Sequence, residues 1–181
     1  MNSLIRTADP CDAPRIIALQ REAGVGRTNP QWPSTGFVNY KIPTLGEYVR
    51  RIFQNPFFYV TEVDLDTIGF LAAYDFERFK TLGDPILENL TPHVSHATIY
   101  ADQILVKAPY RGNFVGRELV EKLVADSLRA GKEEVVLFTS HHPRRNEQAI
   151  SLVQNFGFQE LSDFAHENAR YGLYKKMLKD S

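Results

Sequence analysis

The sequence predicts an α/β protein, built from a mixed β-sheet with helices on both of its faces. Three observations support this prediction. Runs rich in β-branched and aromatic residues alternate along the chain with amphipathic helical segments. Two of these runs stand close enough together to form a hairpin. A third run passes through a short basic loop directly into a helix at residues 104–117.

The individual elements follow from hydrophobic periodicity and from residues that cap or end helices. Thr44 with Glu47 is the pattern of a capping box, and Gly131 stands where a long amphipathic helix should end. The expected elements are, in order, a strand at 4–6, a helix after Asp12 that ends near Gly24, a helix at 44–54, strands at 57–63 and 67–74, a strand at 97–106, a helix at 115–130, a strand at 134–140, a helix at 146–156 and a strand at 171–178.

Two segments lack such a pattern. Residues 25–43 are rich in proline and glycine and are expected to form a flexible loop or a lid over a pocket. Residues 77–92 are charged and are expected to be a surface excursion with one helical turn. The acceptor pocket would be made by residues 25–45 and 74–95, which include these segments. The aromatic residues that could line such a pocket, or belong to the core, are Trp32, Phe37, Tyr40, Tyr74 and Phe76.

Composition limits the classes of function. The 181 residues, 43% of them hydrophobic and 24% charged, fit a single globular domain over residues 1–181. The formal net charge is −1, which argues against nucleic acid or an anionic membrane as the main partner. No apolar run approaches the roughly 20 residues that span a bilayer. With one cysteine, Cys11, the chain cannot form an internal disulfide, so a cytoplasmic location is expected.

The junction at residues 104–117 predicts an anion site. The first N–H groups of a helix have no acceptor within the helix, and the helix dipole adds partial positive charge at the same place. Gly112 and Gly116 would let the main chain approach a ligand or adopt a positive φ, and Arg111 adds a donor that fits phosphate oxygens. Taken alone, the pattern also fits an ordinary glycine-bearing turn before a helix.

Residues 106–116 resemble the acetyl-CoA diphosphate loop of the GCN5-related N-acetyltransferase (GNAT) superfamily, whose pattern reads Arg/Gln, x, x, Gly, x, Gly/Ala. Arg111 and Gly116 match the two ends of that pattern, and Gly112 matches a commonly accompanying glycine. Phe114 replaces the middle glycine. Because main-chain N–H groups hold the phosphates, a phenylalanine can keep the donor while its ring turns away, but it puts the loop geometry and the affinity in doubt.

Residues 146–158 resemble a second GNAT signature, in which an asparagine opens a helix and Gly-Phe closes it. Asn146, Ala149, Gly157 and Phe158 match it. The asparagine could cap the helix, contact the cofactor, or do both.

The resemblance implies the GNAT fold, with a mostly antiparallel central sheet whose fourth and fifth strands splay apart. It also implies acetyl-CoA as cosubstrate, held by free main-chain groups in the splay and by the loop. The Val106 N–H would be the natural donor to the thioester oxygen. The residues that the resemblance assigns to the cosubstrate are Ile104, Leu105, Val106, Arg111, Gly112, Asn113, Phe114, Val115, Gly116, Arg117 and Asn146.

One departure concerns the leaving thiolate. The family often has a tyrosine seven residues after the asparagine, near the cofactor sulfur, and this chain has Val153 there. Valine carries no proton. Either the thiolate leaves unaided, since a thiol pKa of about 8.5 makes it a tolerable leaving group, or Tyr171 or Tyr174 supplies the proton.

The strand before the loop carries the candidate catalytic residues. If no bulge intervenes, alternation places Tyr100, Asp102, Ile104 and Val106 on one face. Asp102 is the candidate general base, directly or through water, for an amine that must lose a proton before it attacks. It could instead pair with an arginine or cap a loop. Tyr100 could shape the pocket or relay a proton.

Other chemistries fit less well. His141 and His142 point in opposite directions on an extended strand and have no further ligand at metal spacing, so no metal is expected. A Ser-His-Asp hydrolase is disfavoured because the chain contains no G-x-S-x-G. The loop lacks the Gly-Lys-Ser/Thr ending of a nucleotide-binding phosphate loop. Cys11 has no histidine in a recognisable motif nearby and is not expected to be a nucleophile.

The leading hypothesis is therefore an acetyl-CoA-dependent N-acetyltransferase acting on a primary amine of a small molecule or a peptide, by direct attack on the thioester. The alternative is a non-catalytic acyl-CoA-binding module, which Val153 and Phe114 both permit. Dimers are common among proteins that it resembles, so a homodimer is compatible with the resemblance, although no residue pattern indicates it. The acceptor itself cannot be identified from the sequence.

Overall fold

The computed structural model describes residues 3–24 and 41–178. The expected loop or lid at 25–43, with Trp32, Phe37 and Tyr40, lies almost wholly outside them. The described elements are β1 (Leu4–Thr7), η1 (Pro10–Asp12), α1 (Ala13–Glu22), α2 (Leu45–Ile52), β2 (Phe58–Val63), β3 (Asp66–Tyr74), α3 (Phe76–Phe79), η2 (Pro85–Asn89), η3 (Thr91–His93), β4 (Thr98–Val106), η4 (Ala108–Tyr110), α4 (Val115–Arg129), β5 (Glu134–His142), α5 (Glu147–Asn155), β6 (Gln159–His166) and β7 (Ala169–Met177).

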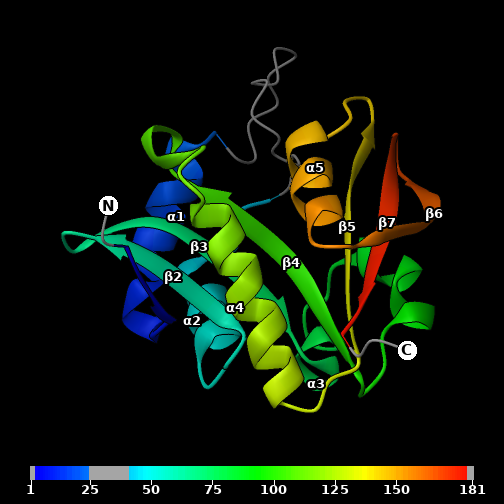
Figure 1. Ribbon diagram of the computed structural model, residues 1–181, viewed down its shortest axis with the longest axis horizontal. Coiled ribbons are helices and arrows are strands. Elements are labelled where there is room, and N and C mark those ends of the chain that lie inside the picture. Colours follow the sequence, from blue (N-terminus) through cyan, green and yellow to red (C-terminus); the bar gives the residue numbers. More distant parts are fainter. Residues whose placement is uncertain (1–2, 25–40, 179–181) are drawn as a thin grey trace.

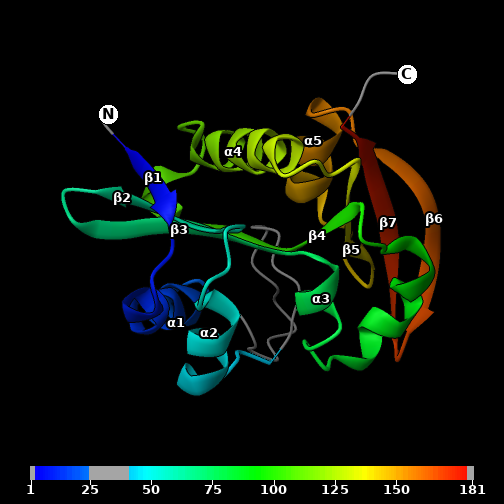
Figure 2. The same cartoon turned by 90° about the horizontal axis from the view of Figure 1, so that it is seen from below.

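The strands form one seven-stranded sheet in the order β1-β2-β3-β4-β5-β7-β6 within the described residues. Every neighbouring pair is antiparallel except β4 and β5, which are parallel. Helices α4 and α5 cover one face of the sheet, while α1, α2 and α3 cover the other (Figure 2). The predicted mixed sheet with helices on both faces is confirmed.

The two faces of the sheet carry separate hydrophobic clusters. On the face covered by α1, α2 and α3, Tyr48 of α2 and Phe58 and Phe70 of the sheet are fully buried. On the opposite face, Leu119 of α4 and Ile150 of α5 belong to the second cluster. Because each strand alternates its side chains between these clusters, both faces are apolar and the sheet is a central layer.

The predicted capping residues act as caps. The Thr44 hydroxyl accepts from the Glu47 N–H at 3.3 Å, and the Glu47 carboxylate accepts from the Thr44 N–H at 2.6 Å, which is a complete capping box before α2. Gly69 of β3 lets the main chain of β4 approach closely, because a Cβ there would lie 2.9 Å from the Leu105 carbonyl oxygen.

One expectation for the connecting segments is wrong. The segment at residues 77–92 is not a surface excursion, because Phe79, Ile86, Leu87 and Leu90 are buried in the core and several short helices replace the single turn. The charged residues of this segment alternate with apolar ones, so the average hydropathy of the whole segment does not reveal the buried side chains.

Strand β6 was not anticipated at all. It is an edge strand whose residues are mostly exposed on both faces, so its sequence lacks the alternation that marks a half-buried strand. Among the described helices, none has both the length and the apolar character needed to cross a bilayer.

Candidate functional site

A gap between β4 and β5 is the central feature of the site. The two strands pair only where Thr98, Ile99 and Tyr100 face Glu134, Val135 and Val136. Beyond these pairs β4 continues along β3, whereas β5 follows β7 over its whole length. The strands therefore diverge, and a cavity of about 450 Å³ lies between them, lined by Ala101–Leu105 of β4 and Leu137–Thr139 of β5.

The cavity passes from one face of the sheet to the other. On the α4–α5 side its walls include Val120, Leu152 and Val153, which belong to or pack against the cluster on that face. On the other side they include Phe70 and Leu87 of the opposite cluster. A ligand held near α4 and α5 could therefore meet, within one cavity, a second ligand that enters from the α1–α3 side.

A β-bulge in β4 corrects the predicted alternation. Ala72 pairs with Gln103 and Ala73 with Ala101, so Asp102 is an extra residue with no partner on β3. The inserted residue inverts the alternation beyond it. Tyr100 lies in the hydrophobic cluster on the face covered by α1, α2 and α3, while Ile104 and Val106 pack against the cluster on the face covered by α4 and α5. The expectation that all four residues share one face is thus wrong for Ile104 and Val106.

Asp102 nevertheless remains next to Tyr100. The Tyr100 hydroxyl donates to Asp102 Oδ1 at 3.0 Å, and Arg51 Nη1 of α2 lies 3.6 Å from Asp102 Oδ2. Burial raises the pKa of Asp102 from 3.8 to about 6; Arg51 opposes this rise, and Asp84 adds to it. Asp102 is therefore a carboxyl group that lines the cavity and can change its protonation state just below neutral pH.

Helices α1 and α2 hold this part of β4 in place. The side-chain oxygen of Gln103 accepts from the Tyr48 hydroxyl at 3.0 Å and from the Gln20 amide at 3.0 Å. Arg51 follows Tyr48 by three residues and so lies on the same face of α2. Sequence reasoning missed these partners, since nothing local in α2 indicates that it packs beside β4; the i, i+3 spacing of a tyrosine and an arginine is the only signal.

The main chain of β4 presents polar groups to the gap. The Lys107 N–H bonds to the Ile68 carbonyl at 2.7 Å and so points toward β3. Since successive N–H groups of a strand point to opposite sides, the Val106 N–H points away from β3, toward the gap. The Val106 carbonyl points the same way and accepts from Arg111 Nε at 2.8 Å.

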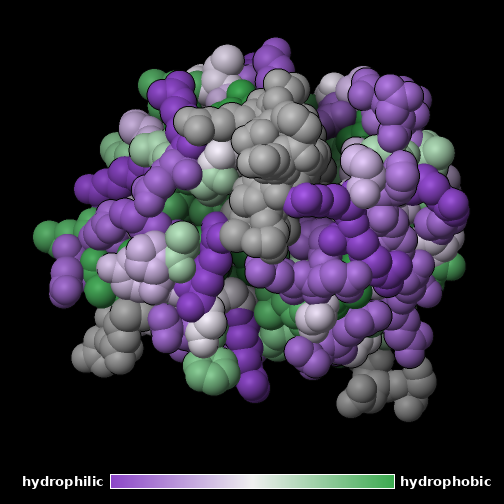
Figure 3. Space-filling model, turned by 90° about the horizontal axis from the view of Figure 1, so that it is seen from above, coloured by the Kyte–Doolittle hydropathy of each residue, from purple (hydrophilic) through white to green (hydrophobic). Residues whose placement is uncertain are grey.

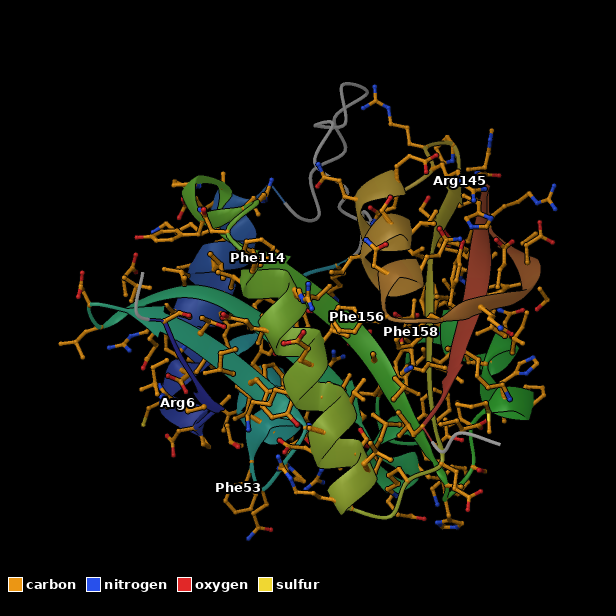
Figure 4. The ribbon with its side chains drawn as sticks, in the orientation of Figure 1. Arg6, Phe53, Phe114, Arg145, Phe156 and Phe158 are labelled. Carbon is orange, nitrogen blue, oxygen red and sulfur yellow. The ribbon has the colours of Figure 1, made fainter. Side chains whose placement is uncertain are left out.

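The loop after β4 has the backbone of an anion site. Gly112 has a φ of +77° and Phe114 a φ of +63°, which together turn the chain into α4. The Glu118 N–H bonds to the Phe114 carbonyl at 2.9 Å and is the first α-helical bond. The N–H groups of Val115, Gly116 and Arg117 therefore lie in the first turn, where a helix supplies no acceptor. Phe114 itself is 68% exposed at the start of α4 (Figure 4).

Asn146 caps α5 on the other side of the gap. Its side-chain oxygen accepts from the Ala149 N–H at 3.1 Å, and its own N–H bonds to the Ser140 carbonyl at 2.9 Å. It is 8% exposed and also lines the cavity. Helices α4 and α5 begin at the same end of the molecule (Figure 1), so two positive helix ends face the same region. In the coloured part of Figure 3 the surface at this end is mostly hydrophilic, with hydrophobic residues in small separate areas.

The two tyrosines considered as proton donors differ in position. Tyr171 lines the cavity. Tyr174 is engaged elsewhere, because its hydroxyl lies 2.9 Å from His141 Nε2 and donates to the Glu160 carboxylate at 3.1 Å. Burial and the Glu160 charge raise the pKa of Tyr174 to about 12. Val153 is 5% exposed and lines the cavity, as its place in the sequence suggested.

Other candidate residues lie away from the gap. Tyr74 is 1% exposed within the core, and Phe76 packs against His96 with ring centroids 4.4 Å apart. Cys11 is exposed before α1. In the parts of the chain that the structure describes, no three His, Cys, Asp or Glu side chains converge as a metal site would require.

The chain is similar to one protein family and to several solved structures. A model of the acetyltransferase (GNAT) family matches residues 27–158. Among solved structures, an N-acetyltransferase from Staphylococcus aureus Mu50 has a TM-score of 0.68 and 21% identity over 99% of this chain and all of that one. The yncA protein of Salmonella typhimurium, solved with its cofactor acetyl-CoA, has a TM-score of 0.67 and 19% identity over 100% of this chain and 96% of that one. Ard1 of Thermoplasma volcanium has a TM-score of 0.71 and 13% identity, covering 99% and 100% of the two chains. No curated protein sequence matches the chain significantly.

Proposed function

Because the chain belongs to the GNAT acetyltransferase family, we propose that it is an acetyl-CoA-dependent N-acetyltransferase that acts on a primary amine of a small molecule or a peptide. One structural observation supports the proposal in addition to family membership. The cavity in the β4–β5 gap extends from Asn146 and Leu152, on the α5 side, to the Asp102 carboxyl group. A donor held beside α4 and α5 and an acceptor beside Asp102 would thus meet within the sheet.

The diphosphate of acetyl-CoA would lie at the start of α4. The first-turn N–H groups of Val115, Gly116 and Arg117 point out of the helix there, and the positive φ of Gly112 brings the loop backbone to the same side. Asn113 and Phe114 would contribute main-chain contacts only. Arg111 would contribute charge, although its Nε already holds the Val106 carbonyl and so shapes the loop as well.

The pantetheine arm would pass along β4 in the gap. Ile104 and Leu105 line that gap, the Val106 N–H points toward it, and Asn146 lines it from the opposite side. The co-crystallised acetyl-CoA of the yncA protein and the coenzyme A bound to PaiA N-acetyltransferase of Thermoplasma acidophilum support this cosubstrate. When bound, acetyl-CoA supplies the acetyl group as an activated thioester.

The residues of this chain would divide the work of transfer. Asp102 accepts the proton that the attacking ammonium must lose, directly or through one water. The Val106 N–H donates to the thioester oxygen as negative charge develops on it. Tyr100 positions the Asp102 carboxyl group through its 3.0 Å hydrogen bond. The nitrogen–carbon bond forms and the carbon–sulfur bond breaks. The second proton that the nitrogen loses goes to the leaving thiolate, and Tyr171 is the cavity-lining hydroxyl that can relay it.

Coenzyme A release on mixing the protein, acetyl-CoA and a panel of primary amines tests the proposal. We expect saturable release, and a fall of about 100-fold or more in kcat for Asp102→Asn with unchanged acetyl-CoA affinity by calorimetry. Asp64→Asn, an exposed position in the β2–β3 turn, is the matched control and should leave both quantities unchanged. Tight acetyl-CoA binding without turnover on any amine would identify a non-catalytic acyl-CoA-binding module instead.

A further inference from the structure

The α1–α3 side of the cavity has an aromatic wall. Phe138 of β5 and Tyr171 of β7 meet edge to face, with ring centroids 5.4 Å apart and planes at 90°. Tyr100 of β4 stacks on Phe138 at 6.2 Å with planes at 9°. All three residues line the cavity, as do Ile86 and Leu87. A ligand ring inserted here could stack on the face of one aromatic side chain and contact the edge of another, and both arrangements are attractive for aromatic pairs.

The segment between α3 and β4 completes this wall. It lies on the α1–α3 side of the sheet, beside β6 and β7 (Figures 1 and 2). Ile86 and Leu87 of this segment are 8% and 7% exposed, so they form a fixed apolar surface. A position for a ring against Phe138 and Tyr171 is therefore built from several elements and does not depend on one loop.

The charges at this end of the cavity are mainly negative. Asp84, Asp102 and Glu167 all line it. Their fields reach the aromatic wall: the pKa of Tyr171 is raised by burial and then by the charges of Glu167 and Asp84. Arg51 pairs with Asp102 and these two charges offset each other, so the excess negative charge comes from Asp84 and Glu167 against the exposed Lys41 of the described lining. An acceptor that carried its own carboxylate would face these carboxylates, whereas an ammonium group would be attracted.

The size of the cavity limits the acceptor further. A cavity of roughly 150 Å³ holds one benzene ring in a protein core. The 450 Å³ in the β4–β5 gap therefore has room for one ring, a short linker and the acetyl end of the donor. A larger or branched acceptor would have to extend out of the cavity.

We propose that the acceptor is a small arylalkylamine, with its ring against Phe138 and Tyr171, its amine at Asp102 and no carboxylate of its own. The proposal rests on the N-acetyltransferase function proposed above. It makes Phe138 and Asp84 specificity-determining residues that have no part in cosubstrate binding. The ring supplies apolar contact, and Asp84 and Glu167 select for positive charge.

Steady-state kinetics on the full chain with three probes tests this inference. Phenethylamine has the ring and the amine, L-phenylalanine adds only a carboxylate, and 1,4-diaminobutane has two amines without a ring. We expect kcat/KM for phenethylamine to exceed that for each other probe by about tenfold or more. Equal or higher kcat/KM for L-phenylalanine or 1,4-diaminobutane overturns the inference and leaves the N-acetyltransferase function standing. Failure of all three probes and of the wider amine panel overturns both.

Two variants locate the specificity. Phe138→Leu should raise KM for phenethylamine by about threefold or more without changing KM for acetyl-CoA, because it removes only ring contacts. Phe76→Leu, a ring outside the cavity, is the matched control. Asp84→Asn should narrow the preference for phenethylamine over L-phenylalanine. An unchanged preference in a variant that melts like the parent chain contradicts the assignment, and calorimetric titration of the parent chain with phenethylamine in the presence of coenzyme A gives an independent reading.

Discussion

The substitution Asp102→Asn is expected to lower activity and raise stability at the same time. Asparagine has nearly the same shape as a protonated aspartate and can keep the hydrogen bond from the Tyr100 hydroxyl. It cannot accept a proton from an attacking amine, so turnover should fall. It also removes a negative charge from a site where burial disfavours that charge.

The size of the stability gain follows from the pKa of Asp102. The value is about 6 in the folded chain against 3.8 for an ordinary aspartate, and each pKa unit corresponds to about 1.36 kcal/mol. The folded chain holds this proton more tightly than the unfolded chain. The stabilising contribution of the protonated form is therefore complete below about pH 3.8 and is lost as the pH rises through about 6. At pH 7.5 the ionised carboxylate lowers the free energy of unfolding by about 3 kcal/mol, which the asparagine variant avoids.

Urea denaturation of both proteins at several values between pH 4 and pH 8 measures this difference. We expect the free energy of unfolding of Asp102→Asn to be close to that of the parent chain near pH 4. As the pH rises it should exceed the parent value, by up to about 3 kcal/mol above pH 7. The exposed substitution Asp64→Asn should show no such pH dependence. If the Asp102→Asn variant instead becomes less stable than the parent as the pH rises, the ionised carboxylate stabilises the fold through its pair with Arg51, and the reasoning from burial is refuted.

Three further substitutions test the loop after β4 and the neighbouring strand β3. Arg111→Ala should weaken coenzyme A binding by more than tenfold, measured by calorimetry, and should change pantetheine binding little. Equal weakening of both ligands would mean that the main role of Arg111 is its hydrogen bond to the Val106 carbonyl. Phe114→Gly should raise the free energy of unfolding by up to about 1 kcal/mol in urea, because it relieves a positive φ at an exposed ring, and should leave coenzyme A affinity within about twofold. Gly69→Ala should lower the free energy of unfolding by about 1–3 kcal/mol, since its Cβ would lie 2.9 Å from the Leu105 carbonyl oxygen; a neutral effect would show that β3 can shift.

Features set by local chemistry could be predicted from the sequence. The capping box of Thr44 and Glu47 depends only on residues three apart, and the turn into α4 depends on the positive φ of Gly112 in the loop before the helix. The same holds for Asn146, whose side chain caps α5 as its position indicated. Each of these signals is complete within a few residues, so no knowledge of tertiary contacts is needed to recognise it.

Features set by tertiary pairing could not be predicted. The bulge at Asp102 exists because β4 has one residue more than its partner β3 between two pairs, which only the register reveals. The same is true of Arg51, whose ion pair depends on α2 lying beside β4. Strand β6 pairs with β7 although its own sequence has no alternation, because an edge strand exposed on both faces needs none. In each case the determining residue lies on another strand or helix.

The bulge and the gap are best understood as one device. An inserted residue bends a strand and interrupts its ladder, and here the interruption falls just beyond the last pair between β4 and β5. The bend lets Asp102 and Gln103 both reach the helices beneath the sheet, while Ile104 and Val106 turn to the opposite face. A strand without the bulge would place either the carboxyl group or the Val106 N–H on the wrong side of the cavity. The Asp102 carboxyl group and the Val106 N–H thus both depend on the same extra residue. Deletion of one residue between Tyr100 and Ile104 should therefore lower activity more than any single substitution there.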